Sequence, residues 1–581
     1  MTLGQALGFI QDRKENLRRR KVFLICGFQP LHLETFLKGQ FALCFPGEAL
    51  DTQNGLFGDL EQTLVTAAAS QADAAAVVIE WSDLDPRLGL RSTGGWAVSV
   101  QADILQTCQA RLRRIFARIQ ALAAKVPVAL APPTVCLPAL GHTAGWQSSV
   151  VELELQRIVA AFLADASRVP GVAVLSAPRL SRVSPEGSRL DPTLELKAGF
   201  PYSIPHASAL AGELIKLMFP RTPMKGLITD LDDTFWCGIV GEVGVGGVSW
   251  SLAEHTQIHG LYQQMLHHLA EMGVLIAAAS KNELPVVEQA LARQDLLCPA
   301  KSVFPVIANW GAKSKSVAEI LRVWNIGPEA VVFVDDSPME LDEVCAAFPD
   351  MKCLQFHGKQ PAKVLALFEE LRDLFGKPAL QREDALRQAS IRANVAVQAG
   401  AAESSSADFL RSLQGRLTFD HRKDPANKRA LELINKTNQF NLNGARISEG
   451  EWMRHLSDPD CFVVSVAYED KFGPLGIIGA IAGRMAGSRL EVTTWVMSCR
   501  AFSRRIEHHT LQHLFEHWDV DAIQLAFQPT ARNEPLQQFV RQLDASSGSI
   551  ARHAFLEQTH ELPHAVVVEA RENEVPSAQP A

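Results

Sequence analysis

The sequence predicts an α/β protein of several domains, and three observations lead to this prediction. Short apolar runs alternate with longer segments of helical periodicity, which is typical of parallel sheets covered by helices. The 581 residues exceed a single core, because a domain usually holds about 100–150 residues. The composition, 47% hydrophobic and 21% charged, is that of an ordinary globular chain. We interpret the chain as three domains with a linker and a short tail.

Charge and composition argue against several functions. A net charge of −8 disfavours unspecific binding to nucleic acid, which relies on excess Lys and Arg. No apolar run reaches about 18 residues, and residues 1–20 are charged where a signal peptide is apolar, so we expect a cytoplasmic protein with no membrane partner. The ten cysteines form no CxxC pair, which predicts free thiols.

The first domain is expected over residues 1–221. Residues 1–20 predict an amphipathic helix that ends in the basic run Arg18–Lys21. Apolar runs predict strands at Val22–Cys26, Ala75–Glu80, Val126–Ala131 and Val172–Leu175, and helical periodicity predicts covering helices at Ala102–Ala124 and Val150–Ala166. Two prolines, Pro220 and Pro223, then predict a linker.

Two arginines of this domain have two interpretations. Arg87 and Arg91 follow a predicted strand and lie four residues apart, so their guanidinium groups can bind a phosphate or a carboxylate as a fork. An ion pair inside the domain explains them equally well.

The middle domain, expected over residues 222–378, begins with an apolar run that ends in Asp230, Asp232 and Thr234. At the end of a strand, Asp230 and Asp232 can both face the crevice where open α/β sheets bind ligands. Asp230 can then act as a nucleophile while Asp232 moves a proton. An anionic nucleophile that attacks a phosphate needs a cation, and carboxylates suit Mg²⁺. From this motif alone, an Asp-rich turn remains the alternative.

Three later segments place more polar groups after apolar runs. Val274–Ala279 is followed by Ser280, Lys281 and Asn282, and Val331–Val334 by Asp335 and Asp336; Lys313 lies between them. This order of Asp, Ser, Lys and paired Asp resembles the four motifs of the haloacid dehalogenase superfamily. The surrounding residues, together with Thr437–Leu442 downstream, resemble its FkbH-like branch over about residues 222–530.

The resemblance implies a fold and a function for each domain. It implies a flavodoxin-like or SGNH-hydrolase-like first domain, a Rossmann-like haloacid dehalogenase core and a GNAT-like mixed α+β domain. The activity it implies is Mg²⁺-dependent removal of phosphate from 1,3-bisphosphoglycerate, a small phosphorylated acyl donor, with transfer of the glyceryl unit to an acyl carrier protein. A plain Mg²⁺-dependent phosphatase acting on a sugar or glycan precursor and a non-catalytic scaffold that binds a carrier protein are the alternatives.

The resemblance also implies roles for the motif residues. Asp230 and Asp232 would be catalytic, Lys313 would stabilise the leaving phosphate, and Mg²⁺ would lie among Asp230, Asp232, Asp335 and Asp336. Thr234, Ser280 and Asn282 would contact the phosphoryl group.

A cysteine and a glycine-rich segment follow the first motif. Cys237 lies seven residues after Asp230, where a nearby cation would lower the pKa of its thiol and allow it to accept an acyl group; a small apolar residue of a flap is the alternative. The segment Gly238–Gly247 lacks GxGxxG spacing and predicts a hairpin flap.

Residues 379–408 predict a linker and residues 409–570 a third domain, with a disordered tail over 571–581. Apolar runs predict antiparallel strands at Phe462–Val466, Ile477–Ala482 and Leu490–Met497, a helix over Ser503–Trp518 and a strand at Ile523–Ala526. This order resembles the GNAT acyltransferases, but Arg500–Arg505 lacks the glycines of their pyrophosphate loop. Possible pantetheine contacts are Asn438, Gln439, Asn441, Arg500 and Arg504.

Histidines of the first and third domains complete the candidates. The stretch Leu24–Gln29 has no hydroxyl group where SGNH esterases have their serine after the first strand, which argues against esterase activity. His206 is either the counterpart of the esterase histidine or a helix-cap or packing residue. His509, His513 and His517 lie four residues apart, so they share one helix face. Two of them have the spacing of metal ligands, but without a carboxylate or thiolate nearby we interpret them as a solvated or interface face.

Overall fold

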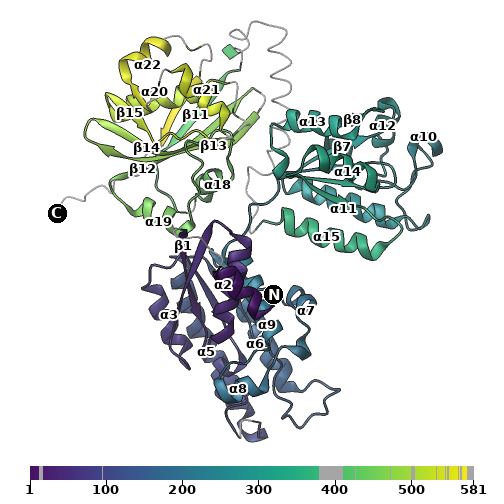
Figure 1. The fold of residues 1–581 in the computed structure, drawn as a ribbon, viewed down its shortest axis with the longest axis vertical. Helices are drawn as coiled ribbons and strands as arrows, with labels where there is room; N and C mark the ends of the chain where they lie inside the picture. The colour runs from purple at the N-terminus through teal and green to yellow at the C-terminus, as the bar shows by residue number, and fades with distance from the viewer. Residues whose placement is uncertain are drawn as a thin grey trace, which may run out of the picture. The chain divides into compact units, whose positions relative to one another are not determined.

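The computed structural model describes residues 1–11, 17–93, 96–377, 410–411, 413–425, 427–471, 473–498, 501, 504–530, 533–543, 545, 548–559, 562 and 566–571. The chain forms two compact units, Met1–Arg221 with Ser448–Arg454, and Thr222–Ile447 with His455–Ala581. Three sheets run through these units (Figure 1). The predicted α/β class is confirmed, because two sheets are parallel and the third is mixed. No helix within the described ranges has the length and apolar character that crossing a membrane requires.

The first sheet has five parallel strands in the order β2-β1-β3-β4-β5. The strands are β1 (Arg18–Ile25), β2 (Glu48–Asn54), β3 (Ala74–Val78), β4 (Val128–Ala131) and β5 (Val172–Val174). Longer helices are α1 (Leu3–Gln11), α2 (Leu31–Cys44), α3 (Leu60–Ala68), α5 (Gln101–Ala123), α6 (Val150–Ala166) and α9 (Ile204–Met218); shorter ones are α4 (Trp81–Leu84), α7 (Ala177–Val183) and α8 (Pro192–Ala198). This strand order is that of a doubly wound, flavodoxin-like sheet.

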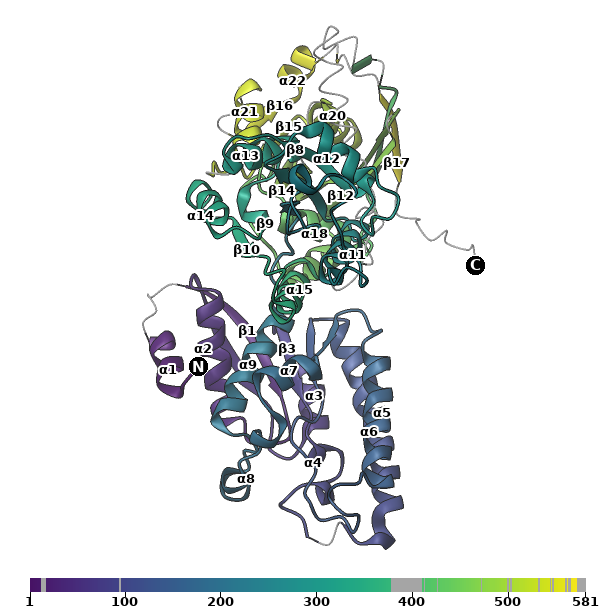
Figure 2. The same ribbon diagram turned by 90° about the vertical axis from the view of Figure 1, so that its right-hand side faces the viewer.

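Helices cover both faces of the first sheet (Figure 2). On one face α1, α2 and α9 pack on the apolar side chains of β1, β3 and β4, and on the other face α3, α5 and α6 do so. Helices α5 and α6 coincide with the predicted ranges to within one residue, because their helical periodicity is regular.

The start of the chain differs from the prediction. Helix α1 ends at Gln11, and the basic run Arg18–Lys21 opens strand β1 instead of closing a helix. Its side chains meet acidic residues of β2, since Arg20 pairs with Glu48 at 2.6 Å and Arg19 with Asp51 at 2.8 Å. Strand β2 itself was not predicted, because an edge strand with one buried residue has no apolar run.

The second sheet is also parallel, in the order β10-β9-β6-β7-β8. The strands are β6 (Gly226–Thr229), β7 (Leu275–Ser280), β8 (Val303–Ala308), β9 (Val331–Asp335) and β10 (Lys352–Gln355). The helices are α10 (Val240–Val243), α11 (Gln257–Glu271), α12 (Leu284–Leu291), α13 (Lys313–Trp324), α14 (Pro338–Ala347) and α15 (Pro361–Phe375). The chain adds β7 and β8 on one side of β6 and then β9 and β10 on the other, so the topological switch point lies between β6 and β9.

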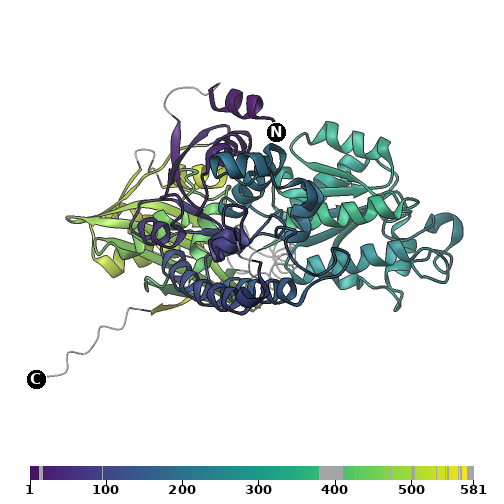
Figure 3. The same ribbon diagram turned by 90° about the horizontal axis from the view of Figure 1, so that it is seen from below.

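Helices of the second sheet also lie on both of its faces, as the view in Figure 3 shows. Helices α11, α12 and α15 pack on one face, and α13 and α14 on the other. Gly226 is required at the start of β6, because a β-carbon there would lie 2.5 Å from the Trp324 ring of α13. The central strand is therefore held close to the helix that carries Lys313.

The third sheet is mixed, in the order β16-β15-β14-β13-β12-β11-β17. The strands are β11 (Gly415–Asp420), β12 (Cys461–Asp470), β13 (Gly473–Ala486), β14 (Arg489–Met497), β15 (Ala522–Leu525), β16 (Ser549–Ala551) and β17 (Val566–Arg571). The helices are α18 (Lys428–Lys436), α19 (Glu449–Ser457), α20 (Ile506–Trp518), α21 (Glu534–Gln542) and α22 (Arg552–Thr559). The three predicted antiparallel strands and the following helix and strand are present in the predicted order.

Candidate active site

The acidic residues of the second sheet meet at its switch point. Strand β6 ends at Thr229, so Asp230 follows it directly, and the neighbouring strand β9 ends in Asp335. All residues of both strands are buried, which explains their continuous apolar runs. Because parallel strands end at one edge, Asp230 and Asp335 lie side by side where open α/β sheets bind ligands.

Helix α11 holds the loop that follows β6. The ring of His259 contacts the carbonyl of Thr234 at 2.9 Å, and Gln263 donates to the carbonyl of Phe235 at 3.0 Å. The hydroxyl of Tyr262 donates to Thr229 at 3.1 Å. These buried contacts position the loop on a rigid element.

Three carboxylates form a possible cation site. Oxygen atoms of Asp230, Asp335 and Asp336 all lie within 4.8 Å of one another. Burial raises the pKa of Asp230 and that of Asp335, and burial together with Asp335 and Asp233 raises the pKa of Asp336 to about 6. Three carboxylate oxygens are hard ligands that suit Mg²⁺, and a bound cation would favour the ionised form of these buried acids.

Lys313 is the positive charge beside this group. Its side chain is 3% exposed, and its Nζ donates to Asp230 Oδ1 at 2.6 Å and to Asp335 Oδ2 at 2.9 Å. Although burial alone lowers the pKa of Lys313, Asp230 and Asp335 outweigh it and raise that pKa above its usual range. The ammonium group therefore stays charged and fixes the two carboxylates.

The sequence analysis missed one further acid at this site. Glu340 lies 2.6 Å from Lys313 Nζ and 2.9 Å from that of Lys281, which links the loop after β7 to helix α14. Burial opposes its ionisation, but these two ammonium groups hold the pKa of Glu340 below its ordinary value. Its position five residues after Asp335, in the first turn of α14, was the available signal.

Asp232 lies outside the group of three carboxylates, although we expected it among the metal ligands. Its Oδ1 accepts hydrogen bonds from Trp236 Nε1 at 2.8 Å and from the backbone of Val240 at 3.1 Å, and its Oδ2 accepts one from Asn282 at 2.8 Å. Its carboxylate is thus oriented by the loop after β6, by the start of α10 and by the loop after β7, which suits proton transfer.

The expected phosphoryl contacts are buried. Asn282 also donates to Ser280 Oγ at 3.0 Å, so the amide joins Ser280 to Asp232. The hydroxyl of Thr234 lies 3.5 Å from Asp336 Oδ1. These three side chains order the carboxylates around them, and their contact with a phosphoryl group stays a prediction.

Cys237 lies at the mouth of the site. A cavity of about 780 Å³ is lined by Cys237, Asp233 and Asp336, and by the basic groups of His255, His259, His357 and Lys359. Burial and Asp233 raise the pKa of the Cys237 thiol, and Lys359 only partly offsets them. The lowering of this pKa that we expected depends on a bound cation and stays a prediction.

The segment after Cys237 also differs from the expected flap. Cys237 and Ser249 form an isolated antiparallel bridge, with backbone hydrogen bonds of 2.9 and 3.1 Å. Helix α10 lies between them, so the segment is a closed loop with a helical turn and not a hairpin. Gly238 has φ +100°, a conformation that favours glycine.

Three of the expected pantetheine contacts form hydrogen bonds or ion pairs within the chain. Asn441 is buried and donates to Thr437 O, and Arg504 is buried against Asp470 at 3.0 Å. Gln439 donates to Asn325, which follows the C-terminal end of α13, about 18 Å along that helix from Lys313.

Asn438 and Arg500 are the other two expected pantetheine contacts. Asn438 accepts a hydrogen bond from Arg446. Arg500 lies outside the described residues, and the binding of a pantetheine group stays a prediction.

Residues of the first unit form an internal hydrogen-bond network instead of an open esterase site. His206 is fully buried between the hydroxyls of Thr134 and Ser184, each at 2.9 Å, and Thr134 donates to Glu80 at 2.6 Å. Burial raises the pKa of the Cys26 thiol, which disfavours a nucleophile there. His206 is therefore a packing residue.

Arg87 and Arg91 of the first unit have different partners. Arg87 pairs with Asp85 and Asp103, each at 2.7 Å. Arg91 donates to the backbone oxygen of Glu195 at 3.3 Å. For Arg87 the structure therefore favours the second interpretation, an ion pair inside the domain.

Glu80 and His206 predict an unusual pH profile of stability. Burial raises the pKa of Glu80 from 4.5 to about 7, so its contribution is lost as pH rises through 7; burial lowers that of His206 from 6.5 to about 3, so its contribution is lost as pH falls toward 3. Between pH 4.5 and 6.5, the ordinary pKa values of the two side chains, the effects of Glu80 and His206 on the slope of stability against pH cancel. Relative to the unmodified protein, Glu80→Gln should make stability rise by about 1.4 kcal/mol per pH unit there, and His206→Asn should make it fall equally.

Urea midpoints of the first unit, followed by proteolysis and mass spectrometry of its peptides, measure these slopes. If stability depended on pH in the same way in the unmodified protein, Glu80→Gln and His206→Asn, the burial of a protonated Glu80 beside a neutral His206 would be contradicted.

Comparisons with known proteins support the fold. No family model matches this chain, and no curated protein does. Among solved structures, the N-terminal part of the protein BF1531 from Bacteroides fragilis, containing a phosphatase domain complexed with Mg, aligns with a TM-score of 0.51. The two chains share a fold. The alignment covers 65% of this chain and 100% of that one at 17% identity, so it carries information on the fold alone.

A second match is too weak to use. An uncharacterized protein from Corynebacterium glutamicum ATCC 13032 Kitasato aligns with a TM-score of 0.19 at 15% identity, over 26% of this chain and 98% of that one.

Proposed function

We propose that the second sheet carries a Mg²⁺-dependent phosphatase of the haloacid dehalogenase type. The observation that carries the proposal is the meeting of Asp230, Asp335 and Asp336 within 4.8 Å, beside the buried Lys313, at a topological switch point. The similar structure from Bacteroides fragilis contains a phosphatase domain complexed with Mg, which supports the same activity.

The residues divide the chemistry between them. Asp230 attacks the phosphorus atom, the bond from phosphorus to the leaving oxygen breaks, and Asp232 gives that oxygen a proton. Asp232 then takes a proton from water, which hydrolyses the aspartyl phosphate and frees inorganic phosphate. Lys313 keeps Asp230 oriented through Oδ1. Mg²⁺, when bound by Asp230, Asp335 and Asp336, neutralises charge between the nucleophile and the phosphate.

The test is phosphate release from p-nitrophenyl phosphate and from a panel of phosphomonoesters. We expect release with Mg²⁺, loss with EDTA and recovery with added Mg²⁺. Undiminished release in EDTA, or no release from any substrate, would contradict the proposal.

We further propose a more specific activity for this site, the transfer of a glyceryl unit to an acyl carrier protein. Supporting it, Cys237 and Asp336 line one cavity, together with basic groups that suit an acidic substrate. The Cys237 sulfur would attack the acyl carbon of 1,3-bisphosphoglycerate, and the bond from that carbon to the phosphate oxygen would break. Because the thiol is protonated, a base must take its proton, and His255 and His259 line the same cavity.

Two further steps complete the transfer. Asp230 and Asp232 would remove the second phosphate as described above. The thiol of the carrier's phosphopantetheine would then take the glyceryl unit from Cys237, which regains a proton.

Cys237→Ala separates these functions. We expect it to abolish a covalent glyceryl adduct, seen by intact mass after incubation with Mg²⁺ and 1,3-bisphosphoglycerate, because alanine has no nucleophile. Phosphate release from p-nitrophenyl phosphate should continue. Cys345→Ala in α14 is the matched control, and it should keep the adduct.

The other outcomes identify the alternatives. An adduct that survives in Cys237→Ala removes this cysteine from the scheme. Phosphate release with no adduct in the unmodified protein indicates a plain phosphatase for a sugar or glycan precursor. Carrier binding without any turnover indicates a scaffold.

A further inference from the structure

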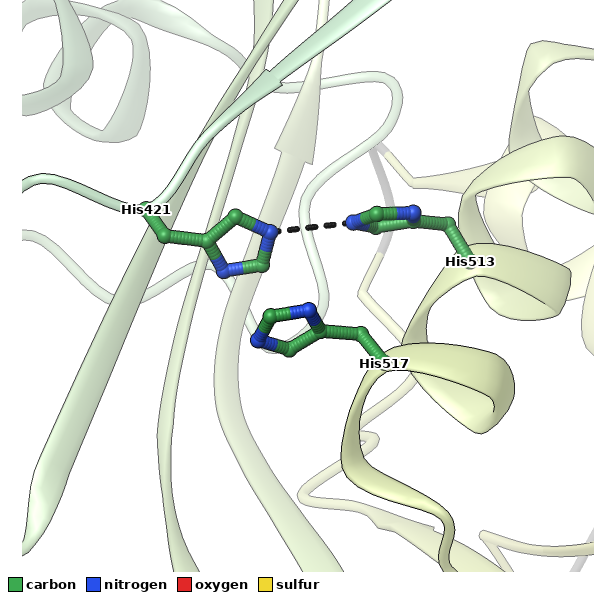
Figure 4. Close-up of side chains that lie close together, drawn as sticks. All are labelled: His421, His513 and His517. Carbon is green, nitrogen blue, oxygen red and sulfur yellow. Dashed lines mark hydrogen bonds between the residues drawn. The ribbon is translucent and has the colours of Figure 1, made fainter. Parts of the chain in front are cut away.

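Three histidines from distant parts of the sequence meet in the third sheet's domain. His421 follows strand β11, and His513 and His517 lie one turn apart on α20. One ring nitrogen from each lies within 4.8 Å of the others. Figure 4 shows the three rings around a common space, with His421 and His513 facing each other across it. The spacing on α20 predicted only that two of them share a face.

A hydrogen bond joins two of these rings, and the third ring stacks on one of them. Nε2 of His421 lies 3.0 Å from Nε2 of His513, and both residues are buried. The His513 ring stacks on Phe419 with centroids 3.9 Å apart and 9° between planes, which sets its orientation. His517 is exposed, and its ring stacks on His421 at 4.0 Å.

A hydrogen bond between two neutral imidazoles, such as that between His421 and His513, can give way to metal binding when one proton shifts. In the hydrogen bond to His421 one Nε2 carries the proton and the other accepts it. Moving that proton to Nδ1 of the same ring frees both Nε2 lone pairs without net proton release.

The distances agree with tetrahedral coordination. A tetrahedral Zn²⁺ with bonds of about 2.0–2.1 Å separates its nitrogen ligands by about 3.3 Å, so His421 and His513 need to part by only a few tenths of an ångström. The stacked His517 ring must turn so that the lone pair of one ring nitrogen points at the ion between His421 and His513. Rotation about the terminal side-chain torsion is soft, and the exposure of His517 leaves room for it.

We propose that His421, His513 and His517 bind one Zn²⁺ ion, separately from the carboxylate site of the second sheet. Imidazole is the ligand type that zinc and similar transition metals prefer, whereas Mg²⁺ prefers oxygen. Three protein ligands leave a fourth position for water or a substrate atom on the exposed side of His517. The site ties the end of β11 to α20, two elements that are 92 residues apart at the ligands.

The test is a metal titration of the full-length chain, freed of metal with a chelator and then kept in excess Mg²⁺ to occupy the carboxylates. Co²⁺ serves as the spectroscopic probe, because tetrahedral Co²⁺ absorbs strongly in visible light, and Zn²⁺ competition gives the affinity. We expect one Co²⁺ per chain with a tetrahedral spectrum, displaced by one Zn²⁺.

The variants His421→Gln and His517→Gln should each bind Zn²⁺ at least about 100-fold more weakly, since removing a ligand costs no less than removing an outer-shell partner. His509→Gln is the matched control, one turn earlier on α20 and outside the cluster, and it should bind as the unmodified protein does. Because His517 is exposed, its variant should fold, and an unchanged circular dichroism spectrum checks this.

Two results would overturn the zinc site. One is an absence of Co²⁺ and Zn²⁺ binding in the unmodified chain, which would leave a hydrogen-bonded histidine pair. The other is binding in His421→Gln and His517→Gln that is as tight as in the unmodified protein, which would place the ion elsewhere.

Discussion

Replacing Asp230 with Asn is expected to reduce kcat/KM for Mg²⁺-dependent phosphate release by about 10⁴-fold or more, because an amide cannot replace the carboxylate as a nucleophile. Asparagine is nearly the same size, and its Oδ1 can still accept the hydrogen bond that Lys313 donates at 2.6 Å. The loss should therefore reflect chemistry and not collapse of the site. Initial rates of phosphate release, with thermal unfolding measured in parallel, check the prediction.

Asp233→Asn is the matched control for this variant. Asp233 lines the cavity that Asp336 also lines, but it lies outside the three-carboxylate group. Its Oδ1 accepts a hydrogen bond from the backbone of Gly238 at 2.8 Å, which an asparagine oxygen can also accept. Its φ of +50° is a conformation that asparagine tolerates well. Activity that survives in Asp230→Asn, or an equal loss in Asp233→Asn, would remove Asp230 from its role as nucleophile.

Three strands of the second sheet, β6, β7 and β9, could be predicted because they are buried on both faces, whereas the partly exposed edge strands β8 and β10 were not predicted. Strands that are buried on both faces have continuous apolar runs, and each run ends where polar residues reach the edge of the sheet. For this reason Asp230, Ser280 and Asp335 could be placed at strand ends from the sequence. Strand β2 could not be found, because it has mixed composition and pairs only with β1.

Contacts between separate elements were not predictable from spacing. Nothing local shows that Glu340 of α14 meets Lys313 of α13, or that His421 meets His513 of α20. The surroundings of Cys237 were equally hidden, since burial and Asp233, which the folded loop brings near, raise the pKa of its thiol more than Lys359 lowers it.

Lys313→Met is expected to destabilise the metal-free second sheet by about 3–5 kcal/mol, which is the usual cost of removing one partner from a buried ion pair. Three carboxylates, those of Asp230, Asp335 and Glu340, lie within 2.9 Å of Lys313 Nζ and would be left without this partner. Removal of the ammonium raises the carboxyl pKa values of Asp230 and Asp335 further. The destabilisation should therefore grow as pH rises, because buried carboxylates must then ionise without compensation.

Added Mg²⁺ distinguishes this electrostatic cause from lost packing. Methionine fills most of the volume of the lysine stem, so a packing defect would not respond to a cation, whereas charge repulsion among Asp230, Asp335 and Asp336 would be relieved by one. We expect excess Mg²⁺ to recover a substantial part of the lost stability, measured as the urea midpoint of the second sheet's peptides. Lys315→Met, an exposed site on the same helix, should change stability little under either condition. A Lys313→Met deficit that is unchanged by both Mg²⁺ and pH would contradict a charge-balanced cation site, and would mean that Lys313 supports the fold by packing alone.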